Sequence, residues 1–224
     1  MERSLRVPIA ITLGGIIIAG AVYISMPKSF STSTGDPALV RPISVNDHIL
    51  GNPAAPVVIV VYSDFECTFC KDFNKTLLRQ VTAHGGASGK VALVYRHFPL
   101  TEIHPNALSH AKAAESIAET AGNIAFWKFA YELFENQPVN PLQYGKLASA
   151  IGISGNDFTS CYTNIPELIE ERIAADRQNA LDIGAEGTPY SLILVAGKPP
   201  VVMNGAYPYI AVKQLVDDAL QTIE

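Results

Sequence analysis

Cys67 and Cys70 are the residues whose type and spacing most directly suggest chemistry. They lie in the stretch SDFECTFCKDF, residues 63–73, and are two of the three cysteines in the chain. Two thiols at this spacing can serve as a redox dithiol, as half of a metal site or as a structural disulfide. The segments on either side must decide between these uses.

The cysteines stand between a predicted strand and a predicted helix. Residues 56–62, PVVIVVY, form a continuous β-branched run that predicts a strand buried on both faces. Residues 68–84 carry apolar side chains at helical spacing, and two glycines follow to end that helix. Residues 90–98, KVALVYRHF, predict the next strand. The pattern is therefore a βαβ unit with Cys67 at the strand-to-helix turn.

Thiol–disulfide exchange needs a thiolate, and a free cysteine titrates near ~8.5. Cys67 at a helix N-terminus faces unpaired backbone N–H groups and the positive end of the helix dipole, which favour the anion. Cys70 lies one turn inside the helix and is better shielded. We therefore expect Cys67 to be the attacking thiolate and Cys70 the resolving thiol, close enough in space to form one bond.

The N-terminal segment predicts a membrane anchor. Residues 7–26 contain no charged side chain, and twenty residues of helix span roughly 30 Å, the thickness of a hydrocarbon core. Arg3 and Arg6 precede this segment. The positive-inside bias therefore places residues 1–6 in the cytoplasm and the rest of the chain outside it.

A cleaved signal peptide is the competing interpretation, since Ala19-Gly20-Ala21 resembles a cleavage site. The apolar run continues to Met26, which favours an uncleaved anchor in the cell membrane over a secreted or periplasmic product. Outside the cytoplasm disulfides persist, and a chain of this size does not need one for stability. Residues 27–46, rich in Ser, Thr and Pro, are expected to be a linker.

The length and composition of the chain are typical of one globular domain with additional segments. The chain has 224 residues, of which 48% are hydrophobic and 17% charged, with a formal net charge of -5. Lysine and arginine are scattered singly, without the basic stripe that nucleic-acid binding requires. We therefore expect no nucleic-acid partner.

The second half of the chain changes from helix signals back to strand signals. Alanines recur at helical spacing from Ala107 to Ala121, and Gly122 is placed to end that helix. Further helix signals continue to about residue 184. Strands are predicted at 190–196 and 200–206, followed by a last amphipathic helix.

Five stretches together resemble the DsbA-like group of thioredoxin-fold proteins, which are exported thiol–disulfide oxidoreductases. They are VVIVVYSDFECTFCKDF, YRHFPL, HPNALSHAKAA, GTPYSLIL and NGAYPY. The resemblance implies an α/β fold, with a thioredoxin-like core at 47–103 and 185–224. An all-helical insertion at 104–184 would interrupt this core.

The resemblance also implies a role for Thr188 and Pro189. A cis Thr-Pro bond would pack beside the dithiol, leaving the backbone of Thr188 to bind an extended substrate segment as an added strand. No cofactor besides the Cys67–Cys70 disulfide is implied, and no metal. The implied partners are exported protein substrates and a redox protein that recycles the dithiol.

Two departures from the family pattern leave the direction of electron flow open. Many thioredoxin-fold oxidoreductases have a buried acid six residues before the first cysteine, where this chain has Val61. The residues between the cysteines are Thr68 and Phe69, which help to set the redox potential. Potentials of related proteins range from about -270 to about -120 mV.

Other residues near the motif have simpler expected roles. Asp64 and Glu66 are expected to be solvated turn residues whose charge would oppose a thiolate, whereas Lys71 would favour it. Cys161 is expected to be a buried, inert thiol beside Phe158.

The histidines and the tryptophan are expected to pack or to cap. His97, His104 and His110 have no predicted chemical role, although His97 has a case for lying near the dithiol. Trp127 is expected in the core.

The leading hypothesis is an anchored, exported oxidoreductase that donates disulfides to other exported proteins. A reductase or isomerase on the same site is the first alternative. The second is a membrane-tethered copper-binding protein, although such proteins commonly carry C-x-x-x-C plus a histidine. Three cysteines exclude a four-cysteine zinc site, whereas a site of two cysteines and two histidines stays open.

Overall fold

The computed structural model describes residues 35–164 and 166–223, within one compact unit, Gly35–Glu224. The expected N-terminal segment 1–6 and membrane anchor 7–26 lie outside the described residues. Within the described ranges, no helix combines the length and the apolar character needed to cross a membrane.

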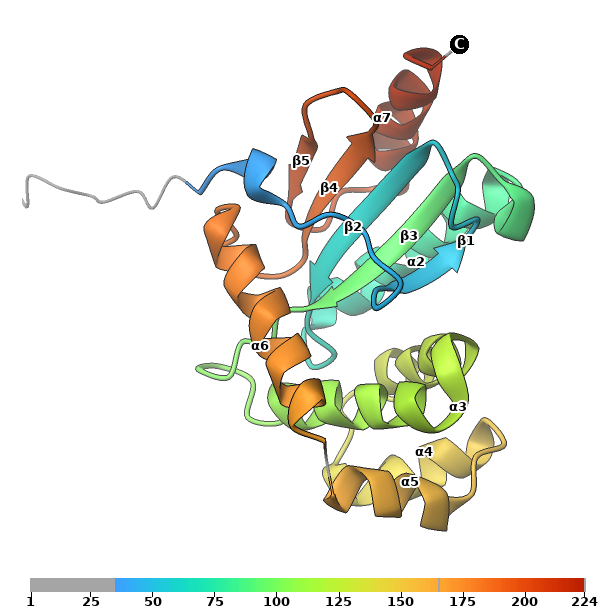
Figure 1. Ribbon diagram of the computed structural model, residues 1–224, viewed down its shortest axis with the longest axis vertical. Helices are drawn as coiled ribbons and strands as arrows, with labels where there is room; N and C mark the ends of the chain where they lie inside the picture. Colours follow the sequence, from blue (N-terminus) through green and yellow to red (C-terminus); the bar gives the residue numbers. More distant parts are fainter. Residues whose placement is uncertain (1–34, 165, 224) are drawn as a thin grey trace, which may run out of the picture. The chain divides into compact units, whose positions relative to one another are not determined.

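A five-stranded mixed sheet forms the centre of the unit (Figure 1). The strand order is β1-β3-β2-β4-β5, with β2 in the middle. β2 pairs with β3 in parallel, and the other neighbours are antiparallel. The strands are β1 (His48–Gly51), β2 (Val57–Ser63), β3 (Val91–His97), β4 (Tyr190–Val195) and β5 (Val201–Asn204).

Helices surround this sheet and build a separate layer beside it. The predicted βαβ unit is present as β2, α2 and β3. The α-helices are α2 (Thr68–Ala83), α3 (Ala107–Glu135), α4 (Tyr144–Ala150), α5 (Gly155–Thr163), α6 (Glu167–Asp182) and α7 (Tyr209–Gln221). Three short 3-10 helices are η1 (Pro37–Leu39), η2 (Gly86–Ser88) and η3 (Pro141–Gln143).

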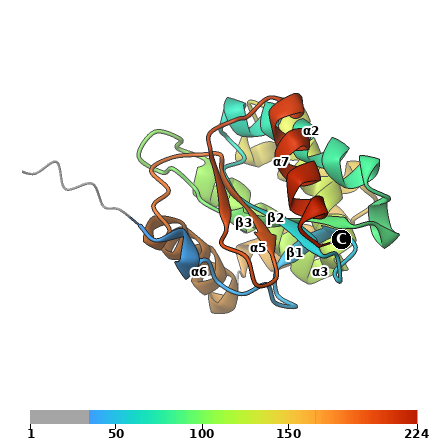
Figure 2. The same cartoon turned by 90° about the horizontal axis from the view of Figure 1, so that it is seen from above.

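Both faces of the sheet are buried, as the β-branched sequence of β2 predicts. Successive side chains of a strand point to opposite faces. Ile59 and Val61 pack in a cluster with residues of α2, α3 and α7. Val60 and Tyr62 pack in a second cluster with residues near the end of α6. Figure 2 shows α2 and α7 on one side of the sheet and α6 on the other.

Gly122 interrupts α3 where the sequence predicts a helix end. Its backbone angles, φ 78° and ψ -177°, are non-helical, and glycine adopts this conformation without a steric penalty. The helix resumes directly after it. Phe126 and Phe129 in this second half are fully buried in the core.

α6 belongs to the sheet as much as to the helical region. The sequence groups residues 104–184 as one insertion, and α3, α4 and α5 do contact one another there. α6, however, contacts β3 and β2 and covers one face of the sheet. Its apolar residues complete the core that the strands cannot bury alone.

The folded unit begins before the expected position near Asp47. The segment from 36 to 41 runs along α6 instead of being part of a linker. Asp36 N–H donates to Asp182 O at 3.0 Å, and Asn179 Nδ2 donates to Leu39 O at 2.8 Å. An extended segment without apolar periodicity carries no sequence signal for such contacts, because its partners lie far along the chain.

β1 was not expected from the sequence. It has only four residues, and its pairing is antiparallel with β3, from His48 opposite Tyr95 to Gly51 opposite Ala92. Four residues are too few to show a strand pattern in the sequence, so β1 is recognised by its pairing with β3. This pairing places His48 in the interior of the protein.

Asn179 should be a major anchor between α6, the sheet and the N-terminal segment. Its Oδ1 accepts from Arg41 N at 3.0 Å and from the Tyr62 hydroxyl at 2.5 Å, and the side chain is buried. Asn179→Ala leaves these groups without partners, so we expect a loss of about 1–3 kcal/mol in urea unfolding. The exposed neighbour substitution Gln178→Ala should change stability by less than about 0.5 kcal/mol. Equal effects of both substitutions would contradict this role.

Candidate active site

Cys67 and Cys70 lie where the sequence places them, at the start of α2 just beyond the end of β2. Cys67 is the N-cap residue of α2, and its side chain caps no backbone N–H group. Both cysteines are thiols in this structure. Cys67 is 4% exposed and Cys70 is 1% exposed. The pair is therefore nearly covered, with Cys67 the more accessible residue.

The surroundings of Cys67 stabilise its thiolate. Its pKa is lowered to about 6, chiefly by a hydrogen bond from the Cys70 thiol, against the opposing effect of burial. The Thr188 side chain and the backbone N–H groups of Cys70 and Phe69 lower it further. The backbone contribution is the helix N-terminus effect predicted from the sequence.

Cys70 behaves in the opposite way. Burial raises the pKa of its thiol well above the ordinary value, and the neighbouring Cys67 raises it further. The Ser63 and Thr188 side chains oppose these effects without reversing them. At neutral pH the pair therefore holds one negative charge, on Cys67, and one proton, on Cys70.

Thr188 and Pro189 pack beside the dithiol, and their peptide bond is cis as expected. The Cys67 thiol donates a hydrogen bond to the Thr188 carbonyl at 3.5 Å. The Thr188 hydroxyl is buried and has no hydrogen-bond partner in this structure. Its proton is therefore available to a Cys67 thiolate.

The two residues between the cysteines face outward. Thr68 is exposed, and the Phe69 side chain is 68% exposed beside the nearly covered Cys67. Val61, at the position of the family's buried acid, lies in the core and pairs across the sheet with Tyr95. No carboxylate can act on the dithiol from that position.

Asp64 and Glu66 are not the solvated turn residues that the sequence suggests. Asp64 is 2% exposed, and its carboxylate accepts from the N–H groups of Glu66 and Leu100 and from His104 Nδ1, at 2.8 to 2.9 Å. Glu66 is half-buried and accepts from the backbone and side chain of Asn106. Both carboxylates thus hold the turn that carries Cys67, because they satisfy backbone donors that would otherwise be unpaired.

Residues at and just after the C-terminal end of α3 form hydrogen bonds with the segment that carries the dithiol. The sequence patterns do not predict these contacts. Gln137 Nε2 donates to the carbonyl oxygens of Phe65 and Cys67, at 2.6 and 3.3 Å. Lys71 Nζ donates to Glu135 O at 3.1 Å. No local pattern marks Gln137, because its contacts depend on how the helical region folds back onto α2.

The histidines have partners of their own. His97 is buried and contacts Glu115, His104 contacts Asp64, and His110 contacts the Tyr144 hydroxyl. The expected packing and capping roles of these residues therefore involve specific hydrogen bonds.

Cys161 and Trp127 are less buried than expected. Cys161 is half-buried on α5, although its neighbour Phe158 is in the core. Trp127 is also only partly buried, at the edge of the main cluster.

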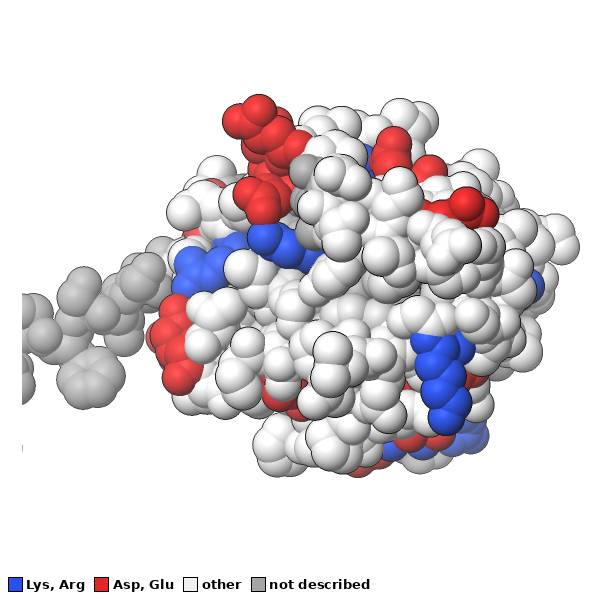
Figure 3. Space-filling model, turned by 90° about the horizontal axis from the view of Figure 1, so that it is seen from below, with Lys and Arg blue, Asp and Glu red and all other residues white. Residues whose placement is uncertain are grey.

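Charges on the surface lie in small groups of both signs on the face shown in Figure 3. Among the described residues, ion pairs such as Lys112–Glu170 and Arg177–Glu102 bring charges of opposite sign together. On the face shown, the mixed distribution does not provide the concentrated positive potential that a nucleic-acid backbone binds.

Comparisons with known proteins identify the family and the fold of the chain. Residues 44–194 match the thioredoxin family. The chain belongs to the thioredoxin family. The α-DsbA2 thiol–disulfide exchange protein of Wolbachia pipientis superposes with a TM-score of 0.68, at 21% identity over 78% of this chain and 88% of that one. The DsbA-like thioredoxin fold with a helical insertion, expected from the sequence, is therefore confirmed.

Two curated relatives match parts of this chain. The Na(+)/H(+) antiporter NhaA 1 of Mycolicibacterium gilvum is 31% identical over 85% of this chain, which spans 29% of that protein. The probable disulfide bond formation protein D of Bacillus cereus is 33% identical over 39% of each chain. This chain covers 29% of the first relative and 39% of the second. The activities in their names are therefore not assigned to it.

The lowered pKa of Cys67 predicts its reactivity. In the reduced Cys161→Ser protein, the rate of alkylation by iodoacetamide should rise with pH to a half-maximum near pH 6, because the thiolate is the nucleophile. Thr188→Val removes the hydroxyl that is available to that thiolate and that lowers its pKa, so the midpoint should move to higher pH. The surface substitution Thr159→Val serves as the control. A midpoint near ~8.5 in the parent protein would contradict the described environment.

Proposed function

We propose that this chain is an exported, membrane-anchored thiol–disulfide oxidoreductase that donates disulfides to other extracytoplasmic proteins. The observation that carries the proposal is the opposite shift of two adjacent thiols, Cys67 toward thiolate and Cys70 toward thiol. Thr188 and Pro189 beside them supply a surface for the substrate backbone. The dithiol itself acts as the redox centre, and no other cofactor is invoked.

The first chemical step opens the Cys67–Cys70 disulfide. A substrate thiolate attacks Sγ of Cys67, the more exposed residue of the pair, and forms a mixed disulfide with it. Cys70 leaves as a thiolate and takes up a proton, because burial raises the pKa of its thiol. The protein is then covalently bound to its substrate through Cys67.

The second step releases the oxidised substrate. A second substrate thiolate attacks the substrate sulfur of the mixed disulfide, and Cys67 leaves as a thiolate. A thiol of low pKa is a good leaving group, and Cys67 has a pKa of about 6. Two electrons have then moved from the substrate thiols to the dithiol, so a second redox protein must reoxidise it.

The direction of transfer follows from what stabilises the reduced form. The pKa of Cys67 is lower in the folded protein than in an unfolded chain, so its thiolate stabilises the folded reduced protein. This stabilisation is complete above ~8.5 and is lost as the pH falls through about 6. A stabilised reduced form makes the disulfide a stronger oxidant, which favours disulfide donation over reduction.

Substrate binding is proposed for the backbone of Thr188. In the thiol form its carbonyl accepts from Cys67, and this bond disappears when Cys67 is a thiolate or part of a disulfide. The carbonyl can then pair with an extended substrate segment. Phe69, exposed beside Cys67, offers apolar contact to the same segment.

Cell location is proposed from the sequence alone. The apolar segment 7–26, preceded by Arg3 and Arg6, supports an anchor with the catalytic domain outside the cytoplasm. The sodium–proton exchange in the name of the antiporter relative is not carried over, because this chain spans 29% of that protein.

Substitution of the two cysteines should separate their roles. Cys67→Ser should abolish disulfide transfer to a reduced, unfolded substrate protein. Cys70→Ser cannot form the Cys67–Cys70 disulfide, so it should not oxidise that substrate either. When it is mixed with an oxidised substrate protein, however, its Cys67 thiolate should attack a substrate disulfide, release one substrate thiolate and accumulate as a mixed disulfide that is visible in non-reducing gels. Cys161→Ser is the matched control and should transfer at the parent rate. Full transfer activity in Cys67→Ser would refute the proposal.

Equilibration with glutathione tests the direction. We expect the Cys67–Cys70 couple to be more oxidising than the glutathione pool, whose potential lies near about -240 mV. A couple more reducing than this pool would instead identify a reductase.

Location is tested by fractionation of cells that express the full chain. We expect the chain in the membrane fraction, with its dithiol accessible to a membrane-impermeant thiol reagent added outside. Deletion of residues 7–26 should abolish export. Recovery of the full chain in the cytosolic fraction would contradict this location.

A further inference from the structure

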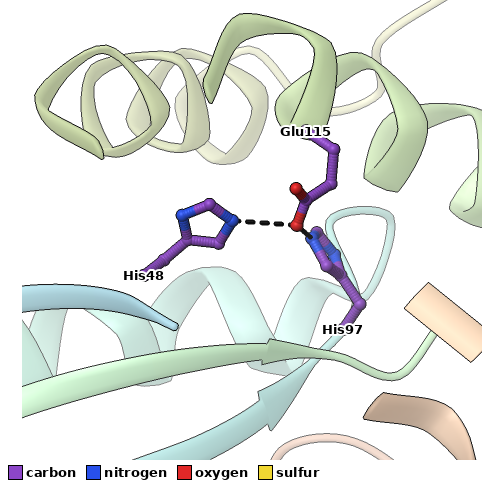
Figure 4. Close-up of side chains that lie close together, drawn as sticks. All are labelled: His48, His97 and Glu115. Atoms are coloured by element: carbon purple, nitrogen blue, oxygen red, sulfur yellow. Dashed lines mark hydrogen bonds and ion pairs between the residues drawn. The ribbon is translucent and has the colours of Figure 1, made fainter. Parts of the chain in front are cut away.

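Three side chains from distant parts of the sequence converge at one buried point. His48 comes from β1, His97 from the end of β3 and Glu115 from α3 (Figure 4). Their exposed fractions are 6%, 1% and 0%. His48 Nε2 and His97 Nε2 lie 2.8 and 3.0 Å from the same carboxylate oxygen, Glu115 Oε1.

These three atoms are of the kinds that ligate metal ions in proteins. One atom from each of the three side chains lies within 4.8 Å of the other two. Two imidazole nitrogens and one carboxylate oxygen form a set that binds zinc and related ions, at about 2.0–2.2 Å from each ligand. Small rotations of the rings around a central ion would satisfy these distances.

Glu115 is fully buried, and its carboxylate lies within hydrogen-bond distance of both imidazoles. A buried carboxylate needs cationic or hydrogen-bonding partners. A divalent cation at the same point would be a further cationic partner.

An opening reaches the cluster from the surface. A cavity of about 410 Å³ is lined by His48, Glu115, Arg172 and Tyr95, among others. It gives an ion a way in and leaves room for water as a fourth ligand, which a site with three protein ligands requires.

Two features should limit the affinity without preventing binding. Arg172 Nη1 lies 2.5 Å from Glu115 Oε2, so the positive charge of Arg172 opposes a cation. The same contact orients the carboxylate, with Oε1 directed at the two imidazoles. His97 Nδ1 is buried without a hydrogen-bond partner. A ligating ring would carry its proton there, where no acceptor holds it.

We propose that His48, His97 and Glu115 form a binding site for a divalent ion of the zinc class, separate from the dithiol. Binding leaves both imidazoles neutral, with the ring proton moved from Nε2 to Nδ1, so no redox step is involved. By joining β1, β3 and α3, the ion would tie the sheet to the helical region. The proposal does not depend on the activity of the cysteines.

Titration with Zn²⁺ alone tests the site. The cysteines would bind zinc themselves, so the experiment uses the full chain with Cys67, Cys70 and Cys161 each replaced by Ser. We expect saturable binding of one Zn²⁺ per chain by calorimetry. Co²⁺ in the same protein should show the visible absorption bands of a four-coordinate site without the charge-transfer band of a thiolate ligand.

Four substitutions locate the ion. His48→Gln and His97→Gln should each weaken binding at least tenfold, whereas the matched control His104→Gln should leave it unchanged. Arg172→Gln removes the opposing charge and should tighten binding, a gain that a damaged fold could not produce.

Absence of saturable binding in the cysteine-free chain would overturn the proposal. So would binding that survives loss of His48 and His97, or a fall in affinity in Arg172→Gln.

Discussion

The opposite displacement of the two thiol pKa values is the constraint on which the site depends. Cys67 and Cys70 are adjacent on one helix turn, yet one is stabilised as an anion and the other as a neutral thiol. The difference arises because Cys67 accepts a hydrogen bond from the Cys70 thiol and further hydrogen bonds from the helix N-terminus, whereas Cys70 is enclosed by the core. A single negative charge at a defined sulfur is what thiol–disulfide exchange requires.

The rest of the fold holds this arrangement in place. The central strand β2 is buried on both faces, so its end at Ser63 is a rigid point from which the cysteine turn departs. Asp64 fastens that turn to the loop after β3, through Leu100 and His104. Glu66 fastens it to Asn106 at the start of α3, and Gln137 fastens it to the segment after α3. Residues of the helical insertion therefore hold the backbone around the dithiol in place through hydrogen bonds.

The buried cluster of His48, His97 and Glu115 is a second place where polar side chains join separate elements of the fold. Each residue comes from a different element, and Glu115 accepts from both rings. The cluster contains no cysteine, so it does not support the copper-binding alternative, in which the dithiol would be the main ligand. Polar side chains this deep hold elements together only when every charge is paired.

The sequence by itself determined the elements and the main chemistry. Buried strands, amphipathic helices and the placement of Cys67 at a helix start follow from local patterns, because hydrophobic period and helix-end chemistry act over a few residues. The breaking position at Gly122 and the cis Thr188-Pro189 bond beside the dithiol were also expected. The tertiary structure decided the burial of Asp64, the hydrogen bonds of Gln137, the packing of residues 36–41 on α6 and the meeting of His48 with Glu115. These depend on contacts between residues far apart in the chain, and no local pattern records which distant partner will satisfy a given polar group.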